Sequence, residues 1–159
     1  MKIIVGIADM KVAKNPEDTL ITYSLGSCIG VTIYDPLIKV GGLLHFMLPD
    51  SRIDPQKAQR NPWVFADTGI PSLFKEAYKL GADKQRMEVK VVGGSQIMDG
   101  AGFFNIGKKN YMSLRKIFRT NGILVSAENV GGNGNRTVSI ELSSGRVLLK
   151  TSGDEVRTL

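Results

Sequence analysis

The sequence is poor in the residues that cross-link small proteins, because its 159 positions include one cysteine and one histidine. One cysteine cannot form a disulfide within the chain, and with one histidine it cannot complete a structural zinc site, which takes several such ligands. The glycine clusters Gly93-Gly94 and Gly131 to Gly134 lack the spacing of dinucleotide-binding or phosphate-binding loops. We therefore expect a fold that needs neither a metal nor a cofactor.

Long hydrophobic runs are also absent. The apolar stretches Ile3 to Ala8 and Gly41 to Leu48 are far shorter than the roughly 20 residues that span a bilayer. Met1-Lys2 is not followed by the apolar core of a signal peptide. We expect no membrane insertion and a cytoplasmic location, where a lone thiol stays reduced. The length suits a single domain over residues 1–159.

Basic residues are in moderate excess, with 21 Lys and Arg against 15 Asp and Glu and a formal net charge of +6. They are spread along the chain rather than clustered, whereas a nucleic-acid footprint usually forms a patch or stripe. A solvated basic surface is therefore favoured, and no nucleic-acid partner is expected. The same charge would suit an acidic protein partner.

Apolar runs rich in valine and isoleucine alternate with a few helical patterns, which is typical of a domain with both α and β structure. Ser143 to Gly145 predicts a tight hairpin between the last two strands. The expected strands are Lys2 to Ala8, Leu20 to Tyr23, Ile29 to Asp35, Val40 to Met47, Glu88 to Val92, Ile123 to Glu128, Thr137 to Leu142 and Arg146 to Lys150.

Two segments have the apolar spacing of amphipathic helices. The first is Ile106 to Thr120, and the second is Phe65 to Leu80, which either kinks at Pro71 or has its regular part begin there. The polar, proline-flanked segment 50–62 is expected to be a mobile surface loop. Residues 152–159 are expected to form a frayed tail.

The feature that points to chemistry is the sole cysteine in its relation to the sole histidine. Cys28 follows the turn Gly26-Ser27 and begins one strand, and His45 lies near the end of the next. A hairpin centred between Pro36 and Leu37 places Cys28 directly opposite His45, with Cβ atoms roughly 4.5 to 5.5 Å apart. In this register the apolar residues collect on one face. The other face carries Cys28 and His45, with the small Gly30 and Gly41 leaving room beside the pair.

Such a pair favours nucleophilic chemistry, because a neighbouring imidazole promotes formation of the thiolate. This hypothesis requires a Cys28 thiol more acidic than a free thiol. The turn at Gly26 and Ser27 leaves backbone N–H groups, including those of Ser27 and Cys28, to stabilise an oxyanion. A lone cysteine is also commonly a small buried apolar residue, and a lone histidine a structural one, so the residues alone leave both interpretations open.

Five runs of residues form a distinctive series along the chain. They are Thr22-Tyr23-Ser24-Leu25-Gly26-Ser27-Cys28-Ile29-Gly30-Val31, His45-Phe46-Met47-Leu48-Pro49-Asp50-Ser51, Gly93-Gly94-Ser95-Gln96, Ile106-Gly107-Lys108-Lys109-Asn110 and Glu128-Asn129-Val130-Gly131-Gly132 with Arg136. In this order they resemble the chemoreceptor glutamine deamidase family, CheD, and the resemblance extends from Val5 to about Lys150. Ser24 is one departure, since glycine is frequent there in the family.

The resemblance implies that Cys28 is the nucleophile, His45 the general base and Thr22 the residue that orients His45. It implies hydrolysis of glutamine side chains in methyl-accepting chemotaxis receptors, with a CheC-like phosphatase as a further partner. It also implies an α+β fold of two packed, largely antiparallel or mixed sheets with helices outside. A non-catalytic module that binds the phosphatase, and a transglutaminase or thiol protease, remain as alternatives.

Overall fold

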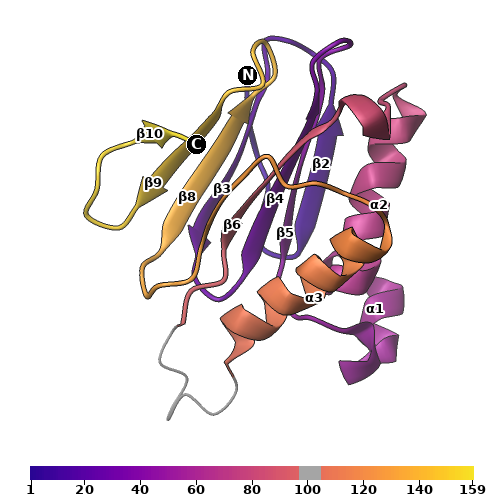
Figure 1. The fold of residues 1–159 in the computed structure, drawn as a ribbon, viewed down its shortest axis with the longest axis vertical. Coiled ribbons are helices and arrows are strands. Elements are labelled where there is room, and N and C mark those ends of the chain that lie inside the picture. Colours follow the sequence, from indigo (N-terminus) through magenta and orange to yellow (C-terminus); the bar gives the residue numbers. More distant parts are fainter. Residues whose placement is uncertain (97–104) are drawn as a thin grey trace.

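A computed structural model describes residues 1–96 and 105–159, and within them the chain forms two five-stranded sheets that pack face to face (Figure 1). Sheet I has the strand order β1-β3-β8-β9-β10, and sheet II has the order β2-β5-β4-β6-β7. The pairs β1–β3 and β6–β7 are parallel and the others antiparallel, so both sheets are mixed. The expected α+β fold of two packed sheets is confirmed.

The strands of sheet I are β1 (Lys2–Ile4), β3 (Thr19–Leu25), β8 (Arg136–Glu141), β9 (Val147–Thr151) and β10 (Arg157–Thr158). Those of sheet II are β2 (Asp9–Ala13), β4 (Ile29–Asp35), β5 (Val40–Phe46), β6 (Glu88–Gly93) and β7 (Ala127–Val130). The helices are α1 (Pro55–Arg60), α2 (Ala66–Lys79) and α3 (Ile106–Thr120), with short 3₁₀ turns η1 (Ser51–Ile53), η2 (Pro62–Val64) and η3 (Lys84–Arg86).

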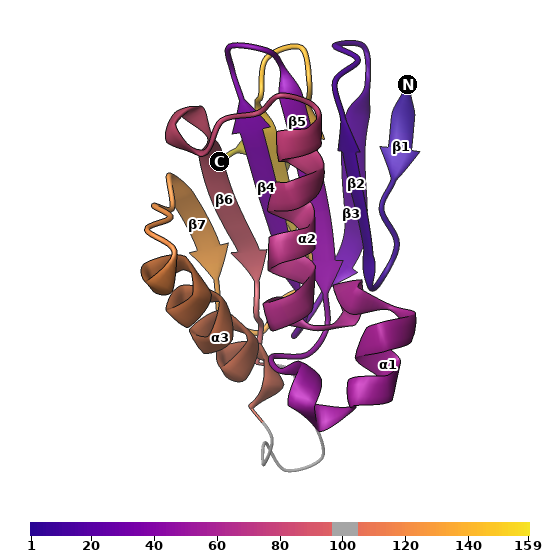
Figure 2. The same ribbon diagram turned by 90° about the vertical axis from the view of Figure 1, so that its right-hand side faces the viewer.

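Sheet II is the middle layer of the molecule. Figure 2 shows α2 and α3 on its outer face, and sheet I covers the other face. Every residue of β4 and β5 is consequently buried. Because both faces pack against apolar side chains, these strands lack the alternation of buried and exposed positions that a half-exposed hairpin shows. The face that carries His45 therefore lies inside the protein, between the two sheets.

Several sequence predictions agree with the structure. The helix α3 has the predicted limits, because its apolar stripe packs on sheet II and Gly122 adopts the positive φ that ends a helix. The hairpin at Ser143 to Gly145 joins β8 to β9 as predicted.

Two predicted strands have wrong boundaries. The predicted strand Lys2 to Ala8 divides into β1 and β2, since Ala8 has a positive φ and the Asp9 carboxylate accepts a hydrogen bond from Gly6 N. The predicted strand Ile123 to Glu128 is instead β7, which begins at Ala127. Helix α2 agrees with the predicted helix Phe65 to Leu80 to within one residue at each end. Because Pro71 lies inside it, the alternative in which its regular part begins at the proline is wrong.

Segment 50–62 is surface-exposed but is not a structureless loop. It contains η1 and α1, and side chains of Asp50, Asp54 and Asn61 cap successive helical turns. The predicted mobility of this segment stays a prediction. Near the C-terminus, β10 pairs with β9 and Leu159 N donates to Val147 O at 2.9 Å, so the last residues of the expected tail are hydrogen-bonded to sheet I.

Candidate functional site

Thr22 and His45 make a hydrogen bond that crosses from one sheet to the other. Thr22 lies on β3 of sheet I and His45 on β5 of sheet II, and Thr22 Oγ1 is 2.8 Å from His45 Nδ1. Both side chains have no solvent exposure. Among the described residues the second ring nitrogen, Nε2, is buried without a hydrogen-bond partner. An unsatisfied buried polar atom costs about 1–3 kcal/mol of stability. A buried nitrogen without a partner is therefore typical of a group that serves function rather than stability.

The register of the β4–β5 hairpin differs from the prediction by two residues. His45 lies opposite Gly30 rather than opposite Cys28. The reason is the turn, which contains four residues between Asp35 and Val40 and places Lys39 at φ 55°. The Asp35 carboxylate stabilises this wider turn by accepting a hydrogen bond from Leu37 N at 3.0 Å.

A shift of two residues leaves every side chain on its predicted face, because side chains alternate along a strand with a period of two. Cys28 lies in the bend just before β4 and packs against the apolar cluster between the sheets. It therefore still borders the inter-sheet face that carries His45, as a diagonal rather than a direct neighbour. Diagonal pairs have Cα atoms about 7–8 Å apart. Gly30 and Gly41 do not leave room beside the pair, because Leu25 and Leu142 side chains fill the space above them.

The turn that carries Cys28 is held by its carbonyl groups. It connects β3 to β4 and hence passes from one sheet to the other, and all three of its carbonyl oxygens accept a hydrogen bond. The donors are Ser95 N to Gly26 O at 2.8 Å, Asn110 Nδ2 to Ser27 O at 2.9 Å and Gly94 N to Cys28 O at 2.9 Å. With the carbonyls bound in this way, the orientation of the peptide groups beside Cys28 is fixed.

Asn110 joins the two halves of the site. Its Nδ2 group also donates to Met47 O at 2.8 Å, so one amide bridges the turn before Cys28 and the segment after His45. The side chain is fully buried, and its Oδ1 has no partner among the described residues. The sequence motifs contain Asn110 but do not single it out. The signal that could have revealed it is a polar residue on the buried stripe of α3, at helical spacing before Leu114 and Phe118.

Glycines allow the supporting segments to approach the turn closely. Gly93 has φ 109°, and a Cβ there would lie 2.3 Å from Cys28 O. A Cβ on Gly107, in the first turn of α3, would lie 2.3 Å from Ser95 O. The buried Arg136 side chain also holds the segment that contains Gly94 and Ser95, because its Nη1 donates to Ser95 Oγ at 2.8 Å. The Gly93-Gly94 cluster therefore serves close packing against Cys28.

The bend before Cys28 places Ser24 in a backbone conformation that suits glycine. The pairing of β3 with β8 is irregular between Thr22 and Leu25, and Ser24 has φ 58°. This left-handed conformation favours glycine, which is the residue frequent there in the family.

Burial determines the protonation states of both reactive groups. It raises the pKa of the Cys28 thiol, an effect opposed by the backbone N–H of the same residue. Burial also lowers the pKa of His45 to about 4, although the Asp9 carboxylate acts in the opposite direction. In the resting protein His45 is thus neutral, and the expectation of an acidic Cys28 thiol is wrong for this state. Because Nε2 has no partner in the described part of the chain, no Cys28–His45 hydrogen bond is present.

The buried, neutral His45 predicts that acid destabilises the protein. The unfolded chain takes up a proton near the ordinary pKa of 6.5, whereas the folded protein does so near 4. Stability is therefore lost as the pH falls between these values, by up to about 3 kcal/mol. Urea unfolding from pH 7 to pH 4.5 measures the effect, and His45→Gln should reduce this dependence. If the free energy of unfolding depends on pH equally in wild type and His45→Gln, the loss of stability does not arise from His45.

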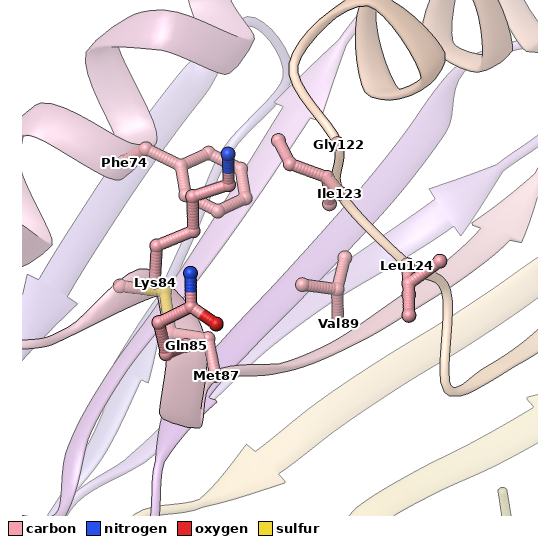
Figure 3. A pocket seen from close by; sticks show the side chains of 8 residues that line it. All are labelled: Phe74, Lys84, Gln85, Met87, Val89, Gly122, Ile123 and Leu124. Atoms are coloured by element: carbon pink, nitrogen blue, oxygen red, sulfur yellow. The ribbon is translucent and has the colours of Figure 1, made fainter.

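A hollow elsewhere in the described part of the chain does not carry comparable chemistry. It has a volume of about 140 Å³ and is lined by the side chains shown in Figure 3, from α2, η3, β6 and the segment after α3. Thr22, Cys28 and His45 do not line it, and its lining contains no acid, cysteine or histidine. Within residues 1–96 and 105–159 there is no cluster of three or more histidine, cysteine or acidic side chains that could hold a metal ion.

Comparison with known proteins agrees with the motifs. The family model described as CheD chemotactic sensory transduction matches residues 47–151. A probable chemoreceptor glutamine deamidase CheD 1 of Syntrophus aciditrophicus is 55% identical over 99% of this chain and 98% of its own length. The chain belongs to the CheD family. A Solibacter usitatus relative is 50% identical over 97% of the chain and 91% of its own length, and a Pyrococcus horikoshii one is 43% identical over 92% and 90%.

Membership of the CheD family confirms the resemblance inferred from the motifs. The segment that holds Thr22, Cys28 and His45 precedes the region matched by the family model and is covered by the full-length relatives. Of the residues described, no helix is both long enough and apolar enough to span a membrane.

Proposed function

We propose that this CheD-family protein is a protein-glutamine glutaminase, which hydrolyses the side-chain amides of glutamines in chemoreceptors through a thioester on Cys28. The observation that carries the proposal is the His45 ring, in which Nδ1 is held by Thr22 and Nε2 has no hydrogen-bond partner among the described residues. The sole cysteine packs at the same inter-sheet face. The names of the full-length relatives, chemoreceptor glutamine deamidases, support the substrate class.

The first step forms a tetrahedral intermediate. Neutral His45 takes the thiol proton on Nε2 as Cys28 Sγ attacks Cδ of the glutamine, and the carbonyl electron pair moves to the oxygen. The backbone N–H groups of Ser27 and Cys28 stabilise this oxyanion, since the neighbouring carbonyls are bound on their other sides. A raised thiol pKa is compatible with this step, because the proton is transferred during attack rather than beforehand.

The remaining steps return the enzyme to its starting state. The intermediate collapses, the C–N bond breaks, and the imidazolium gives its proton to the leaving nitrogen, which departs as ammonia. Water then loses a proton to His45 and attacks the thioester. Collapse of the second intermediate expels the Cys28 sulfur, which regains the proton, and leaves a glutamate side chain. Thr22 keeps the imidazole oriented throughout by its bond to Nδ1.

The direct test is incubation of the purified protein with a folded chemoreceptor cytoplasmic fragment that contains glutamines. Mass spectrometry should find particular glutamines converted to glutamate, with an equal amount of ammonia released. Protein alkylated at Cys28 is the matched control and should convert none. Absence of conversion with a fragment from a matching receptor would contradict the proposal and favour the non-catalytic module that binds a CheC-like phosphatase.

Asn110 is expected to act as a positioning residue in this reaction. Asn110→Ala removes both hydrogen bonds that connect the Cys28 and His45 segments, so we expect kcat to fall about 10- to 100-fold with little change in KM. Asn121→Ala is the matched control, because Asn121 ends the same helix at an exposed position. Both variants are assayed after thermal unfolding has established that they fold. A folded Asn110→Ala protein with wild-type kcat would contradict this role.

A further inference from the structure

The exposed side of α3 carries an unpaired basic surface. Its five basic residues are all solvent-exposed, and the helix has no acidic residue. Among the described residues none of the five forms an ion pair or a side-chain hydrogen bond. These residues, which we call the α3 basic surface, are Lys108, Lys109, Arg115, Lys116 and Arg119.

The α3 basic surface lines a groove of about 970 Å³. Pro49 and Asp50, which follow the His45 segment, form its other wall, and Ser113 Oγ donates to Pro49 O at 2.7 Å. Asp50 is the one acidic residue among the described residues that line the groove, and Arg52 Nε holds its carboxylate at 2.9 Å. Lys116 lies close enough to Asp50 to lower the pKa of its carboxyl, and Tyr111, which also lines the groove, donates to the Glu128 carboxylate at 2.7 Å. Five cations against these two carboxylates leave an excess of positive charge among the described residues.

The groove begins beside the proposed catalytic turn. Lys108 and Lys109 precede Asn110, whose amide holds Ser27 O and Met47 O. From Lys108 to Arg119 the basic residues extend over about 16 Å along the helix, a length that about three turns of a second helix would match. Figure 2 shows α3 on the outside of the molecule with its first residues at the end where β4 begins.

We propose that this groove docks an acidic protein segment that lies next to the target glutamine, so that α3 selects the substrate by charge. The inference rests on the proposed function. Charge complementarity is the argument: five cations that form no ion pair among the described residues, beside a carboxylate that Arg52 already holds, attract an acidic chain and disfavour a basic one. A protein is favoured over a nucleic acid because the groove leads to a site whose chemistry acts on a side-chain amide.

The test compares two charge-reversal pairs. Arg115→Glu/Arg119→Glu changes the groove at positions away from Asn110, and Lys75→Glu/Lys79→Glu changes two exposed lysines with the same spacing on α2. Each variant changes the net charge equally. With an acidic receptor fragment as substrate, the groove variant should have a KM raised about tenfold at low salt with kcat unchanged. The α2 variant should stay within about twofold of wild type.

Two further measurements separate the possible failures. The rate of Cys28 alkylation by iodoacetamide should be equal in all three proteins, and a change in the groove variant would overturn docking as the cause. Direct titration of the fragment onto each protein tests docking even if wild type converts no glutamine. If only the groove variant binds the fragment more weakly than wild type, the result supports the inference. Equal affinity of all three proteins for the fragment overturns it. The same titrations with duplex DNA test the other partner, and a groove variant that loses binding to DNA but still binds the fragment also overturns the inference.

Discussion

Cys28→Ala will abolish conversion of glutamine to glutamate, with the rate reduced about 10⁴-fold or more. The variant retains His45, Thr22 and the bound carbonyls of the turn, but it has no atom that can form the covalent intermediate. Catalytic residues that act together are not additive, so removal of the nucleophile alone usually costs about as much activity as removal of the whole set. The measurement is single-turnover mass spectrometry of the receptor fragment, in parallel with ammonia release.

Cys28→Ser provides the matched control for this experiment. The serine preserves the volume of the side chain and the turn, so thermal unfolding should be close to that of wild type. Its hydroxyl is far less acidic than a thiol, and the conversion rate should remain near that of the alanine variant. Receptor binding should be unchanged in both variants. Conversion by Cys28→Ala at more than about a hundredth of the wild-type rate would exclude the thioester mechanism.

His45→Gln will lower kcat/KM about 10²- to 10⁴-fold, the range that general acid–base catalysis usually contributes. The glutamine amide can still contact Thr22 Oγ1 but cannot exchange a proton at neutral pH. For wild type we expect kcat/KM to fall only below about pH 5, because burial lowers the pKa of His45 to about 4. This acid limb should be absent from the residual activity of the variant over the range in which it remains folded.

Substitutions at Thr22 separate proton transfer from orientation. Thr22→Ser keeps a hydroxyl near His45 Nδ1, whereas Thr22→Val preserves the shape and leaves Nδ1 without a partner. We expect Thr22→Ser to retain most of the activity and Thr22→Val to lose about 10- to 100-fold in kcat. Equal kcat values for the two variants would show that the cross-sheet hydrogen bond does not orient the base.

The sequence predicted the hairpin and the shared face of Cys28 and His45 but not their register. Periodicity determines which residues share a face, and an error of two positions does not alter it. The register depends on the turn, and here Asp35 is held in β4 by Arg86, whose Nη2 donates to its carboxylate at 2.7 Å. Arg86 lies 51 positions further along the chain, and no local pattern indicates that contact.

The predicted acidity of Cys28 failed for a related reason. The sequence indicated an imidazole nearby, and a charged imidazole would lower the pKa of the thiol. In the folded protein His45 is completely buried between two sheets, which keeps its ring neutral. The burial of Cys28 itself raises the pKa of the thiol. Whether a hairpin face meets water or a second sheet cannot be read from the hairpin itself.

By itself, the sequence determined the local elements and the chemical groups. The apolar stripe of α3, the β8–β9 turn and the assignment of β4 and β5 residues to one or the other face of the sheet follow short-range patterns, and each is encoded by residues a few positions apart. The tertiary structure alone decided that Thr22 reaches His45 from the other sheet, that Asn110 bridges Ser27 and Met47, and that burial shifts both pKa values. These features depend on which distant segments pack together and exclude water, which no single segment specifies.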